Sequence, residues 1–164
     1  MAACRLAEME GVNGHNLLLL LTGAYFHDIG FVEQAQDHET ASIRIASAVL
    51  PGCGYSPQDV AVVEGLIEVT RIPQRPHTQL ETILADADLD CLGREDFWVR
   101  SRALYDETIA LNGNFKDNDW CEIQLNFLGA HRYFTPSAVA LRGKRKERHL
   151  EELAMRWRGG LACC

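Results

Sequence analysis

An imidazole and a carboxylate stand side by side at the end of a strongly apolar stretch. His27 and Asp28 follow a segment with five consecutive leucines at 17–21, and Gly30 comes two residues later. Apolar neighbours make both groups costly to bury unless a partner satisfies them. A divalent metal ion would satisfy both groups, whereas a hydrogen-bonded His–Asp pair would need no metal. The pair alone leaves both interpretations open.

A second carboxylate is expected from residues 83–93. On a helix with about 100° per residue, the apolar stripe of this segment consists of Ile83, Leu84, Ala87 and Cys91. Asp88 lies at the edge of that stripe, whereas Asp86 and Asp90 lie on the other flank and are expected to face solvent. Because an inward carboxylate needs a cation or hydrogen-bond donors, Asp88 is the candidate that supports a site.

Two further ionisable residues begin the helix predicted over 39–50. His38 and Glu39 both border its apolar side, where they could face a site. The alternative is a helix N-terminus at which Asp37 and Glu39 simply favour the helix dipole.

Three segments together resemble the HD-domain superfamily of metal-dependent phosphohydrolases. They read AYFHDIGF at 24–31, DHETAS at 37–42 and ILADADLDCLG at 83–93, and the resemblance covers about residues 3–95. The remainder looks like the C-terminal helices of small stand-alone bacterial HD proteins. The resemblance implies that His27, Asp28 and Asp88 hold one divalent metal ion.

The same resemblance implies a reaction. A mixed nitrogen and oxygen donor set suits Mn²⁺, Fe²⁺, Ni²⁺, Co²⁺, Zn²⁺ or Mg²⁺. Such an ion would activate water for hydrolysis of a phosphomonoester or phosphodiester, expected to be a nucleotide. Asp28 would orient the water, and His38 and Glu39 would line the catalytic pocket.

The chain departs from the family at the first histidine ligand. The family places that residue on the helix before the His-Asp helix, but here the helix reads AACRLAEMEGV and has no histidine. The expected position falls before Met1, and His15 comes too late to be assigned. Three ligands are therefore expected instead of four. The alternative function is a degenerate HD-fold binding or regulatory module without catalysis.

His131 and Arg132 end another predicted helix, where positive charge suits the dipole. They are also the predicted substrate-binding residues, because a guanidinium binds phosphate oxygens well.

Helical periodicity, interrupted by Gly and Pro, predicts an all-α fold: a compact bundle of about seven or eight helices in a single domain, 1–164. The metal-site core spans about 3–95 and the C-terminal helices about 96–158. Three sequence patterns mark the starts of helices: a Ser cap at Ser56 followed by Pro57, a capping box at 78–81, and a cap at Thr135. The expected helices span 2–10, 17–29, 39–50, 57–70, 79–92, 95–111, 117–131 and 136–158.

Composition narrows the class of protein. The 164 residues carry a net charge of −7, which disfavours generic nucleic-acid binding. The longest apolar run is far shorter than the ~20 residues of a membrane span, and no secretory signal opens the chain. Six scattered cysteines without a CxxC motif are expected to be reduced thiols. A cytoplasmic protein with a small phosphorylated substrate is expected, and a homodimer is left open.

Overall fold

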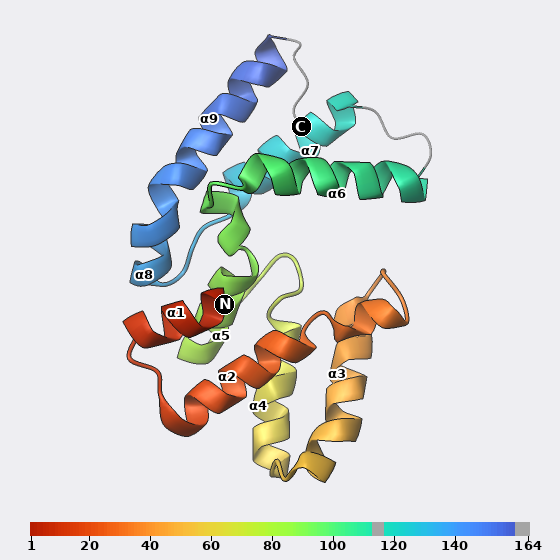
Figure 1. The fold of residues 1–164 in the computed structure, drawn as a ribbon, viewed down its shortest axis with the longest axis vertical. Helices are drawn as coiled ribbons and strands as arrows, with labels where there is room; N and C mark the ends of the chain where they lie inside the picture. The colour runs from red at the N-terminus through yellow and green to blue at the C-terminus, as the bar shows by residue number, and fades with distance from the viewer. Residues whose placement is uncertain (113–116, 160–164) are drawn as a thin grey trace. The chain divides into compact units, whose positions relative to one another are not determined.

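The computed structural model describes residues 1–112 and 117–159, with only the backbone for 111, 112, 117 and 118. These residues form helices and turns without a strand, which confirms the all-α prediction (Figure 1). The contacts divide the chain into two units, Met1–Leu89 and Asp90–Cys164. No described helix has both the length and the apolar character needed to cross a membrane.

The first unit carries five α-helices and two short 3₁₀ turns. They are α1 (Ala2–Met9), α2 (Gly14–Phe26), η1 (Ile29–Val32), α3 (His38–Val49), η2 (Leu50–Cys53), α4 (Pro57–Glu68) and α5 (Gln79–Asp88). Helix α2 packs against α1, α4 and α5, and α3 packs against α4 (Figure 1). One cluster of its core consists of Leu19, Ala46, Leu50, Val60, Val63 and Ile67.

The predicted helix starts are present. At α4 the Ser56 hydroxyl accepts from the Asp59 N–H at 3.2 Å, and the Asp59 carboxylate accepts from the Ser56 N–H at 3.0 Å. At α5 the Thr78 hydroxyl caps the Glu81 N–H at 3.2 Å, but the Glu81 carboxylate accepts from the N–H of His77 instead of Thr78. The second start is therefore a variant of the predicted capping box.

Helix α2 ends earlier than predicted. It stops at Phe26, so that His27 and Asp28 lie in a turn before η1. Gly30 is buried in η1, and a Cβ atom there would lie 2.0 Å from the carbonyl oxygen of His38. The absence of a side chain at Gly30 lets the His-Asp turn lie directly against α3.

The second unit consists of η3 (Asp90–Gly93), α6 (Phe97–Asn112), α7 (Asp117–Ala130), α8 (Pro136–Ala138), the π-helical η4 (Val139–Gly143) and α9 (Lys144–Arg158). The predicted helix 136–158 is thus helical throughout but includes a π-helical turn. Its start is confirmed, because the Thr135 hydroxyl accepts from the Ala138 N–H at 3.1 Å. Helix α9 packs against α7 and η3.

The cysteines only partly follow the expectation of reduced thiols. Cys4 and Cys53 are free thiols and Cys91 forms no disulfide, but Cys121 is disulfide-bonded.

Candidate functional site

Two imidazoles face the two oxygens of one carboxylate. Nε2 of His27 lies 3.3 Å from Oδ2 of Asp28, and Nε2 of His38 lies 3.3 Å from Oδ1 of the same residue. The Nδ1 atoms contact backbone carbonyls three residues earlier, at 3.0 Å for His27 and 3.3 Å for His38. Because a carbonyl only accepts, each Nδ1 carries the hydrogen and each Nε2 is the atom presented to Asp28.

The predicted aspartate on α5 reaches the same place. Oδ1 of Asp88 lies 3.5 Å from Nε2 of His27, and Oδ2 accepts a hydrogen bond from Nε2 of Gln74 at 3.0 Å. His27 is therefore flanked by two carboxylates, Asp28 from its own turn and Asp88 from the end of α5. The Asp28 side chain is 58% exposed, so this cluster opens to solvent.

Glu39 joins the cluster through His38. Its Oε1 lies 3.7 Å from Nε2 of His38, and its Oε2 lies 3.4 Å from the Arg71 guanidinium. The ring of Phe31 stacks on the His38 ring at 3.8 Å between centroids, which fixes the orientation of that imidazole. The structure thus brings together five predicted residues of the first unit, His27, Asp28, His38, Glu39 and Asp88.

Arg71 and Gln74 also belong to this cluster, although the sequence did not indicate them. Both lie in the loop between α4 and α5. Arg71 additionally binds Asp37, Glu68 and the Thr40 hydroxyl, and the Arg71 hydrogen bond is the main reason why the pKa of Asp37 is lowered. A loop without hydrophobic periodicity gives no signal of which side chains it turns toward a site.

Charge around His27 favours its protonated form. Burial lowers its pKa, but the hydrogen bond with Asp88 and the negative charges of Asp28 and Asp88 outweigh burial, so that the pKa is raised. The two carboxylates favour a positive charge at Nε2 of the imidazole between them. This charge is either a proton on Nε2 or another cation that the three groups share.

The donor atoms of the cluster are of the types that bind divalent ions. No group of three His, Cys, Asp or Glu side chains in the described residues is arranged, as it stands, to hold a metal ion. The His27–Asp28 and His27–Asp88 separations of 3.3 and 3.5 Å nevertheless approach the ~3.0–3.4 Å between neighbouring ligands whose bonds to one ion measure about 2.1 Å.

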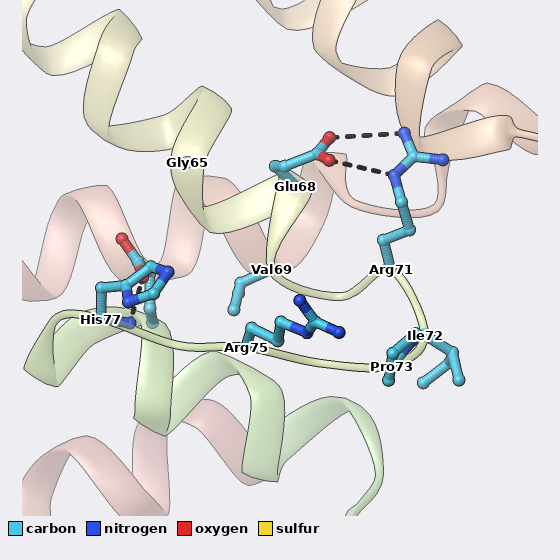
Figure 2. Close-up of a pocket in the computed structure, with 9 residues that line it drawn as sticks. Gly65, Glu68, Val69, Arg71, Ile72, Pro73, Arg75 and His77 are labelled. Carbon is cyan, nitrogen blue, oxygen red and sulfur yellow. Dashed lines mark hydrogen bonds and ion pairs between the residues drawn. The ribbon is translucent and has the colours of Figure 1, made fainter.

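A hollow of about 420 Å³ lies beside the same loop (Figure 2). Its charged lining includes Glu68, paired with Arg71 at 3.1 Å, while the Arg75 side chain lies along the loop. Gln74 reaches Asp88, and its neighbour Arg75 lines the hollow. This one loop therefore lines the hollow and also contacts the carboxylate cluster.

The expectation that Asp86 and Asp90 face solvent is wrong. Asp86 is 1% exposed on α5, a helix that packs against α1, α2 and α4. Asp90 is 6% exposed and binds Arg142 at 2.6 Å. The helical wheel fails at Asp90 because α5 ends at Asp88 and the chain continues as η3.

His131 and Arg132 lie in the second unit, after the last turn of α7. Arg132 donates to the carbonyls of Gly129 and His131 at 2.7 and 2.8 Å, which caps the helix. Lys146 donates to the carbonyl of His131 and lies 3.4 Å from its Nδ1. Burial, together with Lys146 and Arg132, lowers the pKa of His131 to about 4. The predicted substrate role of His131 and Arg132 stays a prediction.

No family model matches the chain, and searches of curated proteins and of solved structures find no significant match.

Proposed function

We propose that the chain is a metal-dependent phosphohydrolase that cleaves a phosphomonoester or phosphodiester, with a nucleotide as the favoured substrate. One arrangement of side chains carries the proposal. His27 and His38 each place Nε2 3.3 Å from an oxygen of Asp28, and Asp88 places an oxygen 3.5 Å from Nε2 of His27. Arg71 contacts the cluster through Glu39, and Arg75 lines the hollow beside the same loop, where its guanidinium could bind a phosphate oxygen.

His27, Asp28 and Asp88 would hold the metal ion. His27 offers Nε2, because its Nδ1–H is donated to the carbonyl of Ala24, and Asp88 is held in place by Gln74. When bound, a divalent ion would lower the pKa of a coordinated water and withdraw electrons from a phosphoryl oxygen.

The remaining side chains act on the water and the leaving group. Asp28 is exposed enough to accept a hydrogen bond from the attacking water with one oxygen. Nε2 of His38 lies at the other oxygen of Asp28, where it can take a proton from the water or return one to the leaving oxygen. Glu39 lies 3.7 Å from this atom and is itself held by Arg71, so it helps to position the imidazole.

A second candidate is the binding or regulatory module without catalysis. Its basis is the missing first histidine of the resemblance, because α1 contains no histidine. Such a module would bind a metal ion or a phosphorylated ligand at the same cluster without turnover.

The experiment compares the metal content and the phosphatase activity of three proteins. The full-length wild type, Asp88→Asn and Asp106→Asn would be incubated with Mn²⁺, desalted and analysed by mass spectrometry, and then assayed on a nucleotide panel. Asp106 is the matched control, because it is an exposed aspartate of the second unit that pairs with Arg102 at 2.9 Å.

We expect near-stoichiometric metal and phosphate release in the wild type and the control, and loss of both in Asp88→Asn. Metal or nucleotide binding without phosphate release would favour the module. Wild-type protein that takes up no metal and releases no phosphate would overturn the phosphohydrolase proposal.

A further inference from the structure

Phe31 lies against the imidazole that would serve the leaving group of the proposed reaction. Its N–H donates to the carbonyl of Asp28 at 3.1 Å, which ties Phe31 to the His-Asp turn. Its ring stacks on the His38 ring, with centroids 3.8 Å apart and an angle of 21° between the planes. The His38 ring therefore has Phe31 on one face, while its Nε2 lies 3.3 Å from Oδ1 of Asp28.

The opposite face of the Phe31 ring is open to solvent. His38 covers one face, and Phe31 is nevertheless 52% exposed. A ring with one covered face can be half exposed only if its other face is accessible. Val32 follows directly in the chain and is 79% exposed. The end of η1 therefore presents an aromatic surface to solvent beside the carboxylate cluster.

The proposed reaction brings part of the substrate to this surface. Nε2 of His38 is the atom that would return a proton to the leaving oxygen, so the alcohol attached to that oxygen would lie beside His38. A nucleoside is such an alcohol, and its base is a flat ring that one sugar separates from the ester oxygen. Every base has a π face that can stack on an aromatic side chain.

We propose that the open face of Phe31 stacks on the base of a nucleotide whose phosphate lies at Asp28, so that Phe31 determines substrate specificity. The inference rests on the proposed phosphohydrolase function, because that function supplies the position of the leaving alcohol. It adds a preference for nucleoside phosphates over sugar phosphates, which the carboxylate cluster alone does not provide.

The test uses two probes that differ in the base. They are analogues of adenosine 5′-monophosphate and of methyl riboside 5-phosphate in which a CH₂ group replaces the bridging ester oxygen, so that neither can be cleaved. Binding of each analogue to the full chain in the presence of Mn²⁺ would be measured by isothermal titration calorimetry. We expect the Kd of the adenosine analogue to be at least about fivefold lower, the lower end of what base–aromatic stacking provides.

Three variants assign the preference to the Phe31 ring. Phe31→Leu keeps an apolar contact with His38 but lacks a flat ring, so the ratio of the two Kd values should fall toward one. Phe31→Trp keeps a flat ring and should retain the preference. Leu18→Ala is the control, because Leu18 is 50% exposed on the first half of α2, and it should keep the wild-type ratio.

Phosphate release from the two cleavable parent compounds separates this inference from the proposed function. A base preference in binding without phosphate release would uphold the stacking site and contradict the phosphohydrolase. Phosphate release from both compounds without a base preference would do the reverse. The stacking site is also overturned if neither analogue binds, if Phe31→Leu keeps the preference, or if Phe31→Trp loses it.

Discussion

The hydroxyl of Ser42 on α3 holds the carbonyl of His27 at the end of α2. It donates to that carbonyl at 2.7 Å and accepts from the Gly30 N–H at 2.8 Å, and the Ser42 side chain is fully buried. The Ser42 hydroxyl therefore satisfies the backbone acceptor just before Asp28 and a backbone donor just after it. This contact fastens the His-Asp turn to the helix that carries His38 and Glu39.

Ser42→Ala should loosen the turn. It leaves a buried carbonyl and a buried N–H without their partner, so we expect the free energy of unfolding to fall by about 1–3 kcal/mol. We also expect weaker Mn²⁺ binding, because His27 and Asp28 lose their fixed position. Chemical denaturation and metal titration would measure the two effects.

Ser47→Ala is the control for this change. Ser47 lies on the same helix and is half-buried, but its hydroxyl binds Ile43 and Glu64 and does not touch the turn. It should lower stability modestly and leave metal binding unchanged. Equal loss of metal binding in both variants would contradict a specific role for Ser42.

Asp86→Ala and Asp88→Ala should separate stability from metal binding. Asp86 is fully buried, so its replacement should lower the free energy of unfolding by about 1–3 kcal/mol while Mn²⁺ uptake remains. Asp88 is part-exposed and faces His27, so its replacement should abolish uptake with little loss of stability. Thermal unfolding and metal analysis of both variants would decide, and loss of metal in Asp86→Ala alone would contradict this assignment.

Arg71→Ala should release the loop between α4 and α5. The guanidinium binds Asp37, Thr40 and Glu68, which fixes the start of the loop that carries Gln74. We expect amide hydrogen exchange in residues 72–77 to become about fivefold faster. A fivefold change corresponds to a loss of about 1 kcal/mol of stabilisation, which is typical of such partly exposed ion pairs.

Arg44→Ala is the matched control, since Arg44 is an exposed arginine that pairs with Glu33 away from the loop. Exchange in residues 72–77 should not change in this variant. If Arg71→Ala also leaves it unchanged, the guanidinium does not fix the loop.

Sequence patterns predicted the helices well because periodicity and caps are local. Ser56 and Thr78 begin their helices as expected, since a cap depends on residues three positions apart. The burial of Asp86 does not follow from the local pattern, because burial on α5 depends on packing with helices distant in sequence, such as α1 and α2. Arg71 and Gln74 were missed for a similar reason, because the path of a loop is set by tertiary contacts.

His131 should make stability depend on pH in the acidic range. Its pKa falls from the ordinary 6.5 to about 4, because burial and the nearby Lys146 and Arg132 disfavour the charged ring. The unfolded chain therefore binds a proton between these two values while the folded chain does not, so this contribution is fully present above pH 6.5. It is lost as the pH falls toward 4, with a slope of at most about 1.4 kcal/mol per pH unit.

His131→Gln should reduce that slope, because glutamine keeps an acceptor for Lys146 but does not titrate. Urea unfolding at pH values between 4 and 7 would measure it, with His77→Gln as the control. His77 is an exposed histidine in the first unit, and the control should keep the wild-type slope. Identical slopes in the wild type and His131→Gln would show that the ring titrates alike in the folded and the unfolded chain.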